Sequence, residues 1–456
     1  MIADAADRHP LAHVLASRGT SAESYLRRVA EQHQAMGFGP QASRREKLSR
    51  WMRGDYAPDF RTQLAMAAIE GIGPEDVHEH GWPGWLTLAI PADRTVLTAP
   101  WTPESTLAAL EITGGMVDRR GFMITTTASL GAVLAQWSAS EPAGAAPRAG
   151  RQIDAKVPAL FERRLDGLRL LDDQIGSGQV YAAARAEMRL ITTTLKEASY
   201  TESVGRLLAS CDGEACRSAG WTAYDSGRLA AAELHYVSGL RSAADAGDPV
   251  TSANILAFWS IGLYSNGNAR GAIALLDAAL SQARKIGSHR MVSMLHARAC
   301  RAHARAGDAR AANRSADAAL SAYAKAGPIE QDPNCVYWYN LGELHQLLGS
   351  SSLNLGHPRR ALEHFQAATQ STDAAGGEQY DAAAFPRGNA IYLARLAEAQ
   401  LALGDVDAAV ATAHQAVQCM GGVISARGGK TLSDLRGKLK TRRAVPEVRD
   451  FLTLTV

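Results

Sequence analysis

The sequence predicts an all-α fold in which a small N-terminal helical bundle precedes an α-solenoid. Alanine, the strongest helix former, is abundant and occurs in runs such as 182–184 and 230–232. Aromatic residues make up only 6% of the 456 residues, so that small side chains can let helices approach closely. Turns that contain glycine recur at regular intervals through the second half of the chain, which indicates a repeat architecture.

Composition and charge limit the classes of function. The chain is 46% hydrophobic and 21% charged, as soluble globular proteins are. The formal net charge is only +2, so any contact with nucleic acid has to come from a local basic patch. The five cysteines are an odd number and form no CxxC pair, which indicates a protein of the reducing cytoplasm.

Changes in composition divide the chain into three regions. Residues 1–90 carry a charged helix and several turn signals. Residues 91–158 form a connector that ends in the Pro/Gly/Ala-rich run 140–150, which predicts a flexible linker. Residues 159–456 consist of one predicted helix after another.

The connector also contains an apolar stretch at 117–140 that begins with two arginines. It resembles a twin-arginine export signal, but such signals stand at the N-terminus. As a membrane helix it is short and contains several Thr and Ser residues. We therefore expect a buried or interfacial helix here and no membrane association.

Five stretches of the third region align on a glycine in a short turn, and the intervals between these glycines are 40, 40, 49 and 48 residues: Gly227, Gly267, Gly307, Gly356 and Gly404. Five residues after each glycine stands alanine: Ala232, Ala272, Ala312, Ala361 and Ala409. Twelve residues after it stands another small residue: Gly239, Ala279, Ala319, Ala368 and Ala416. Small residues at fixed offsets are expected where the two helices of a hairpin touch.

This pattern resembles the turn and second helix of the tetratricopeptide repeat. The glycine that the family has in the first helix is present at Gly220 and Gly349, and Tyr236 and Phe365 stand where a large ring fills the wider gap. The intervals exceed the family's usual period of about 34 residues, so longer helices or loops are expected. The resemblance implies an α-solenoid, which predicted helices at 158–176 and 179–198 would extend or cap.

In the first region, SRREKLSRWMRGDYAPD at 43–59 predicts a short amphipathic helix. Ser43 is a good N-cap, and Gly54 and the following Pro58 end the helix. Leu48 and Trp51, three residues apart, would face the core. Predicted helices precede and follow this one, which gives four or five short helices within 80 residues.

The stretch LSRWMRGDYAP resembles the recognition helix of Xre-type (lambda-repressor-like) helix-turn-helix proteins. Met52 stands where that family usually has Glu, and the turn before Ser43 is longer than usual. With the repeats downstream, the chain is similar to actinobacterial helix-turn-helix regulators that have tetratricopeptide tails. The resemblance implies a transcription regulator of development or secondary metabolism, which binds double-stranded DNA as a homodimer.

The charged face of this helix carries the candidate DNA-binding residues. Arginine can pair with guanine in the major groove, and either basic side chain can neutralise phosphate. We expect Arg44, Arg45 and Lys47 to lie near base edges or phosphates of the DNA. Ser43, Ser49 and Arg50 are expected to contact the DNA backbone. The alternative is an ordinary solvated face.

The first helices of the repeats are expected to line a concave groove that binds a signalling peptide or small molecule. Arginine would bind an acidic group and Asn the peptide backbone. The candidates are Arg217, Trp221, Tyr224, Asn254, Tyr264, Arg301, Arg305, Glu343 and Gln346. The alternatives are that the aromatic residues only pack between repeats, or that the groove holds a partner protein or the other protomer.

No pattern indicates an enzyme. The chain has no GxxxxGK[ST] phosphate loop, no GxSxG motif and no His/Cys set at metal-ligand spacing. We therefore expect no catalysis, no metal and no cofactor. A second hypothesis is that the protein is a tetratricopeptide scaffold for other proteins, with an N-terminal bundle that does not bind DNA.

Overall fold

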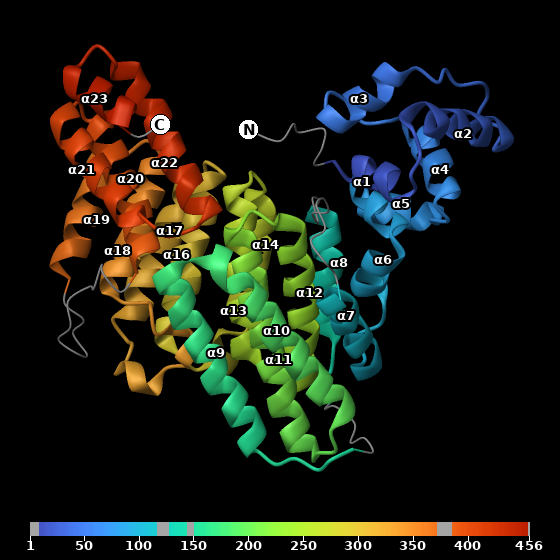
Figure 1. Cartoon of the computed structure of the whole chain (residues 1–456), viewed down its shortest axis with the longest axis horizontal. Helices are drawn as coiled ribbons and strands as arrows, with labels where there is room; N and C mark the ends of the chain where they lie inside the picture. Colours follow the sequence, from blue (N-terminus) through green and yellow to red (C-terminus); the bar gives the residue numbers. More distant parts are fainter. Residues whose placement is uncertain (1–8, 116–126, 144–149, 372–384, 455–456) are drawn as a thin grey trace.

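The computed structural model describes residues 9–115, 127–143, 150–371 and 385–454, and its regular structure in these ranges is helical. One isolated bridge, between Gln152 and Ser199, is the nearest approach to a strand in the described ranges. The predicted all-α fold is confirmed. Figure 1 shows the N-terminal bundle projecting from one end of a much larger array of helices.

The N-terminal bundle is formed by short helices around one aromatic-rich core. They are α1 (Pro10–Ser17), α2 (Ala22–Ala35), α3 (Arg45–Arg53), α4 (Phe60–Ile69), α5 (Pro74–His80) and the 3₁₀ helix η2 (Gly84–Ala89). Leu48 and Trp51 from α3 are buried in this core with Trp85. The bundle is thus held together by its own apolar residues, between Leu11 and Ala89.

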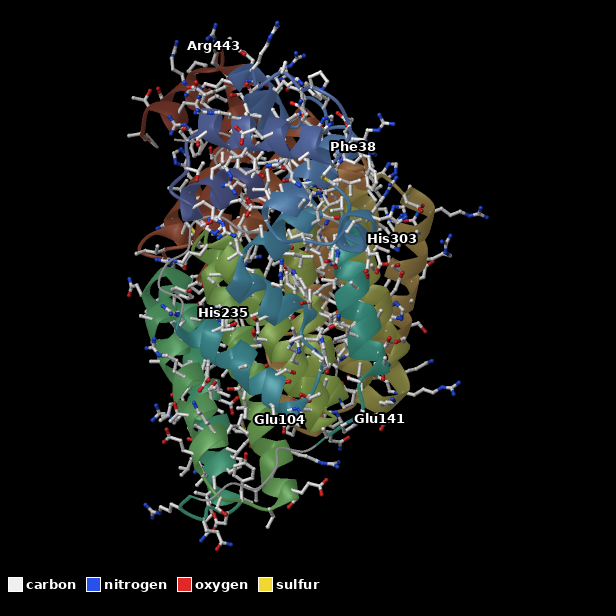
Figure 2. All side chains as sticks on the ribbon, turned by 90° about the vertical axis from the view of Figure 1, so that its right-hand side faces the viewer. Phe38, Glu104, Glu141, His235, His303 and Arg443 are labelled. Carbon is white, nitrogen blue, oxygen red and sulfur yellow. The ribbon has the colours of Figure 1, made fainter. Side chains whose placement is uncertain are left out.

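The connector is docked on the solenoid through α6 (Pro91–Thr98), α7 (Pro103–Gly115) and α8 (Thr127–Ala139). Arg241, which is fully buried, donates to the carbonyl oxygens of Val96, Ala99 and Pro100 at the end of α6, over 2.6–3.1 Å. These carbonyls have no partner within α6, so Arg241 supplies the hydrogen bonds that the helix end lacks. Figure 2 views this side, where α7 and α8 cross the solenoid helices.

The apolar stretch predicted at 117–140 is described from residue 127 onward. There it forms α8, and Leu130 and Val133 are buried in the same core as the solenoid helices. The rest of the stretch lies outside the described residues, as does most of the linker predicted at 140–150. No helix in the described ranges is both long enough and apolar enough to cross a membrane.

The solenoid is a series of helical hairpins. Its helices are α9 (Lys156–Ile175), α10 (Ser177–Glu197), α11 (Glu202–Asp225), α12 (Leu229–Ala246), α13 (Pro249–Ser265), α14 (Ala269–Ser281), α15 (Ala283–Ile286), α16 (His289–Arg305), α17 (Ala309–Tyr323), α18 (Leu341–Asn354), α19 (Pro358–Gln370), α20 (Pro386–Ala402), α21 (Val406–Met420), α22 (Ala426–Leu439) and α23 (Pro446–Leu454), with short 3₁₀ helices η3 (Ile329–Gln331), η4 (Asn334–Val336) and η5 (Lys440–Arg442). The predicted helices at 158–176 and 179–198 correspond to α9 and α10.

The residues that defined the repeats lie where the sequence pattern placed them. All five turn glycines have φ between +78° and +92°, a region that side-chain-bearing residues rarely adopt. The small residues five and twelve positions later are buried in every repeat. A Cβ on Gly220 would lie 2.7 Å from the ring of Tyr236, and one on Gly349 would lie 2.9 Å from Phe365, so each glycine makes room for the ring of its hairpin partner.

The solenoid curls until its first and last hairpins meet. Gly178, at the start of α10, donates to the carbonyl oxygen of Ile424, just before α22. A Cβ on Gly178 would lie 2.5 Å from the side chain of Ile424, so the two segments pack directly. The first helices of the repeats therefore lie around one common groove.

Candidate DNA-binding surface and ligand groove

Helix α3 is amphipathic, as predicted. Leu48 and Trp51 are 1% and 2% exposed, and the Trp51 ring packs edge-on against Trp82. Gly54, with φ +78°, ends the helix, and the next amide donates back to the carbonyl oxygen of Arg50. With one face fixed in the core, the opposite face of α3 is exposed on the bundle (Figure 1).

The predicted DNA-binding residues are placed in two groups. Arg44 and Arg45 are exposed, Lys47 is half-buried, and none of the three forms an ion pair with a described residue. Arg50 instead lies 3.8 Å from Asp55 and over the ring of Tyr56, and Ser49 is half-buried. The first turn of α3 therefore carries the available positive charge.

One local prediction is wrong. Ser43 does not cap α3, because the N-cap residue is Arg44, which makes no capping hydrogen bond with its side chain. Ser43 is exposed just before the helix. The amide of Lys47 donates to the carbonyl oxygen of Arg44, and no side-chain cap accepts from the first amides of α3.

The groove inside the solenoid has a volume of about 870 Å³. Its walls are the first helices of the repeats, α11, α13, α16, α18 and α20, together with α9 and α22 at the ends. The lining also includes residues from the connections before α18 and α20: Cys335, Tyr337, Trp338 and Phe385. This volume is in the range of small-molecule sites.

Seven of the nine predicted ligand residues line the groove: Arg217, Trp221, Tyr224, Tyr264, Arg301, Arg305 and Glu343. Asn254 and Gln346 do not. Asn254 donates to the carboxylate of Glu214 over 3.1 Å, and Gln346 is buried. The prediction for these two residues is wrong.

Sequence reasoning missed the groove residues from α9, α20 and α22. In every repeat the residues six and nine positions before the turn glycine line the groove. Those six positions before it are Trp221, Ile261, Arg301, Ser350 and Glu398. Those nine positions before it are Ser218, Phe258, Arg298, Leu347 and Arg395. Applying these two offsets to all five repeats would have found Arg298 and Arg395. The residues of α9 and α22 lie outside the repeats and follow no such offset.

Charges are balanced in the part of the groove near α9. Arg169 and Arg217 each bond to Glu214 over 2.6 Å, and Arg169 also forms an ion pair with Asp166, so two guanidinium groups face two carboxylates. Burial favours the neutral acid, but the two guanidinium groups outweigh it and lower the pKa of Glu214 to about 2. Arg217 thus contributes little free charge to a ligand.

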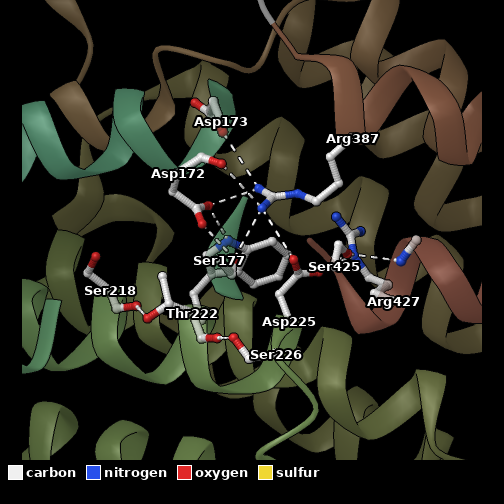
Figure 3. A network of polar contacts seen from close by, with 12 residues as sticks. Asp172, Asp173, Ser177, Ser218, Thr222, Asp225, Ser226, Arg387, Ser425 and Arg427 are labelled. Carbon is white, nitrogen blue, oxygen red and sulfur yellow. Dashed lines mark hydrogen bonds and ion pairs between the residues drawn. The ribbon is translucent and has the colours of Figure 1, made fainter. Parts of the chain in front are cut away.

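A second balanced group joins the two ends of the solenoid, and Figure 3 shows it from close by. Arg387 from α20 bonds to Asp172 of α9 over 2.9 Å and to Asp225 of α11 over 3.3 Å. Arg427 from α22 reaches the other oxygen of Asp225 over 3.4 Å. Burial disfavours ionisation of Asp172, but Arg387 holds its pKa below the usual range. We call Asp172, Asp173, Asp225, Arg387 and Arg427 the clasp.

Trp221 links the clasp to the groove. Its indole N–H donates to Asp172 over 2.9 Å, and the guanidinium groups of Arg387 and Arg427 lie 5.3 and 4.9 Å from its ring centre. The side chain is therefore both packed between repeats and part of the groove lining.

The part of the groove near α16 differs, because positive charge is in excess. Arg298, Arg301 and Arg305 lie along the groove face of α16 and form no ion pair with a described residue. Arg298 is 5% exposed and lies over the rings of Phe258 and Trp338, at 5.1 and 5.2 Å. We call Arg298, Arg301, Arg305 and Arg395 the arginine cluster.

Arg395 from α20 completes the cluster from the opposite wall. It bonds to Glu398 over 2.6 Å, and Glu398 is shared with Lys438 at 2.7 Å. Burial, with the nearby charges of Arg301 and Arg305, lowers the pKa of Arg395 to about 10. Like charges are thus gathered here with too few carboxylates to neutralise them.

The described groove contains ionisable groups with shifted pKa values: burial raises the pKa of Asp173 to about 6 and that of Glu343 to about 7. Burial raises the pKa of Cys335 to about 12, so its thiol is a poor nucleophile at neutral pH. No group of three His, Cys, Asp or Glu side chains in the described ranges is arranged to hold a metal ion.

No protein-family model matches the chain, and no curated protein matches it. Among solved structures, BtubC from P. vanneervenii is 15% identical, with a TM-score of 0.36, over 53% of this chain and 90% of that one. The human IFIT1 dimer with m7Gppp-AAAA is 12% identical, with a TM-score of 0.34, over 99% of this chain and 86% of that one. A monomeric mutant of IFIT1 with m7Gppp-AAAA is also 12% identical, with a TM-score of 0.33, over 97% of this chain and 87% of that one.

Proposed function

We propose that the protein is a DNA-binding transcription regulator of the Xre type. In this proposal the bundle binds double-stranded DNA through the first turn of α3, and the solenoid groove holds an effector. The observation that carries it is the exposed first turn of α3, where Arg44, Arg45 and Lys47 have no ion-pair partner among described residues while Leu48 and Trp51 fix the helix in the core. A recognition helix needs this combination of a rigid position and free basic side chains.

The proposal includes a homodimer, since a single helix-turn-helix unit covers only half of a two-fold symmetric DNA site. Large exposed leucines occur on the first solenoid hairpins, at Leu160, Leu170, Leu171, Leu190 and Leu207. Such residues are candidates for contact between protomers. Sedimentation equilibrium of the purified chain measures its mass directly and decides between monomer and dimer.

The proposal assigns no catalytic activity to the protein. Eight arginines and eight aromatic residues are among the groove-lining side chains, and Cys335 is held as a neutral thiol by its raised pKa. These properties suit binding rather than bond breaking.

The test is DNA retention by the full chain across a salt series, with the DNA upstream of its own gene as probe and unrelated DNA as competitor. Arg44→Ala with Arg45→Ala is expected to weaken binding about ten- to hundredfold and to reduce the salt slope by about 2, because two phosphate or base contacts are lost. Arg163→Ala with Arg449→Ala is the matched control, since both residues are exposed and lie on α9 and α23.

If the wild-type chain shows no sequence-specific retention at any salt concentration, the regulator proposal fails. The scaffold hypothesis, in which the groove or the solenoid surface binds other proteins, would then be preferred. Equal losses in the α3 variant and in the control variant would show that the chain binds DNA only through its net charge and not through α3.

A further inference from the structure

We propose that the groove binds a small molecule carrying one or more phosphate groups, and that the arginine cluster holds the phosphate. The inference rests on the proposed role of the groove as an effector site and names the chemistry of the effector. The sequence patterns left this open between a peptide and a small molecule.

The first argument is charge balance. Arg298, Arg301 and Arg305 have no carboxylate partner in the described ranges, and the one partner of Arg395, Glu398, is shared with Lys438. Two other carboxyl groups are nearby: Asp434, which is paired with Lys430 at 2.8 Å, and Glu343, to which Tyr392 donates a hydrogen bond. Burial raises the pKa of Glu343 to about 7, so it is only partly ionised at neutral pH. A ligand with at least two negative charges would neutralise this surplus.

The second argument is that hydrogen-bond donors outnumber acceptors at the same place. The Nη1 of Arg301, the Nε of Arg395 and the Nδ2 of Asn354 are all shielded from solvent, and they have no acceptor among the described residues. The oxygen of the Asn354 amide already accepts from Arg395, so the amide is held with its NH₂ unpaired. Arg298, at 5% exposure, has only the sulfur of Met294 at its Nε, 3.1 Å away.

Unpaired donors in a shielded site are unfavourable unless an acceptor arrives with the ligand. A phosphate offers several strong acceptor oxygens in a tetrahedral arrangement, which can be reached by guanidinium groups from two walls at once. A single carboxylate offers two oxygens in one plane and one charge. The donors of α16, α18 and α20 therefore match phosphate better than carboxylate.

The third argument concerns the size and the shape of the ligand. A groove of about 870 Å³ suits a small molecule. The amides predicted to bind a peptide backbone are unsuitable, since Asn254 is held by Glu214 and Gln346 lies outside the groove lining. The rings of Phe258, Trp338 and Tyr264 lie beneath Arg298 and Arg301 and fix these guanidinium groups toward the groove.

The experiment is isothermal titration calorimetry of the full chain with pyrophosphate and tripolyphosphate, and with citrate as a carboxylate of comparable charge. We expect saturable binding of one phosphate ligand per chain and much weaker binding of citrate. Arg301→Gln and Arg305→Gln, singly, are each expected to lower affinity about tenfold or more. Arg310→Gln, an exposed arginine on α17 outside the groove, is the matched control and should leave affinity unchanged.

Arg305 is exposed, so its variant should fold even where changes deeper in the groove do not, and thermal unfolding checks this. No saturable binding of either phosphate, equal affinity for citrate, or equal binding by Arg305→Gln and Arg310→Gln would each overturn the inference. The Arg44→Ala, Arg45→Ala variant must bind phosphate like wild type, because binding that disappeared there would place the ligand on the bundle.

The two proposals fail separately. Specific DNA retention without phosphate binding would contradict the inference about the groove ligand but would still support the proposal of a DNA-binding regulator. Phosphate binding that depends on Arg301 and Arg305, without specific DNA retention, would leave the groove site and remove the regulator.

Discussion

Helices α3 and α16 both present arginines on one face, but their surroundings differ. Arg44 and Arg45 are exposed to water at the start of α3, whereas Arg298 is 5% exposed and lies over two aromatic rings in the groove. A hydrated guanidinium pays no free-energy cost when it lacks a protein partner, because water accepts its hydrogen bonds. A guanidinium shielded from solvent without a partner is destabilising, because water no longer accepts hydrogen bonds from its N–H groups.

The absence of an ion-pair partner among the described residues therefore carries different weight at the two helices. On α3 it means only that the side chains are available, and the case for DNA also needs the anchored helix and the family resemblance. On α16 it is itself evidence, since the fold leaves donors and charge unsatisfied at a defined place. The clasp shows that the same groove can neutralise arginine where the structure requires it.

The largest expected effect comes from breaking the clasp. Arg387→Ala leaves Asp172, Asp173 and Asp225 without their shared cation, and removing one partner of a buried ion pair typically costs about 3–5 kcal/mol. We expect a marked fall in the unfolding temperature of the solenoid, measured by circular dichroism. Arg305→Gln, in the same groove but unpaired, should change stability by less than about 0.5 kcal/mol.

The pH dependence of the Arg387→Ala effect provides a control. Asp172 has its folded pKa lowered despite burial, and Arg387 is the cause, so the stability it contributes is lost as pH falls through that pKa. The destabilisation by Arg387→Ala should accordingly be smaller in acid than at pH 7. An unfolding temperature that is unchanged at pH 7 would show that the clasp does not hold the solenoid ends together.

An effect of similar size, but confined to the bundle, is expected from Trp51→Ala. The change leaves a cavity in the bundle core, and large-to-small changes at buried Trp typically cost about 3–5 kcal/mol. Only the bundle should lose stability, because its core residues pack among themselves and not into the solenoid core. Limited proteolysis should cut within residues 9–90 and spare the repeats.

Trp51→Ala also separates two ways of losing DNA binding. Arg44→Ala with Arg45→Ala should weaken binding without altering proteolysis, since these residues are exposed. If Trp51→Ala left the bundle resistant to protease, the assignment of Leu48 and Trp51 as the anchors of α3 would be wrong.

Local sequence patterns predicted the repeats well because the physics of a hairpin is local. A turn glycine with positive φ and a small residue at a helix contact are needed wherever the motif occurs, so Gly227 and Ala232 are recognisable without any knowledge of distant segments. The same holds for Leu48 and Trp51 on α3. Ser43 was mispredicted because Arg44, one position later, takes the N-cap without a side-chain bond.

The parts of the groove that could not be predicted depend on long-range closure. Arg387 meets Asp172 across 215 positions of sequence, and no local pattern indicates that the first and last hairpins approach each other. The prediction for Asn254 failed for a similar reason. Its hydrogen bond to Glu214 joins two different helices, so it depends on how these helices pack. Repeat offsets define the groove walls, whereas the curvature of the solenoid decides what closes it.

The smallest expected effect concerns Glu343, at the boundary between the balanced and unbalanced parts of the groove. It is half-buried, and the groups that act on it are Tyr392, Arg298, Arg427 and Asp173. Burial raises its folded pKa from 4.5 to about 7, so its favourable contribution to stability is complete below about pH 4.5 and is lost as pH rises through 7. Glu343→Gln removes this pH-dependent loss of stability, because the amide does not ionise. The variant should unfold about 1–3 °C above wild type at pH 8 and at nearly the same temperature as wild type at pH 5.

Other groups titrate in the same range, including Asp212, whose pKa is raised to about 7 by burial. They are present in both proteins, so the difference in unfolding temperature between Glu343→Gln and wild type isolates Glu343. In calorimetry the variant should also bind tripolyphosphate more tightly than wild type at pH 8, because the carboxylate that repels the anion is gone. If the unfolding temperatures of the variant and wild type differed by the same amount at pH 5 and pH 8, Glu343 would stay in one charge state over this range. The net positive charge assigned to the groove around α16 would then be wrong.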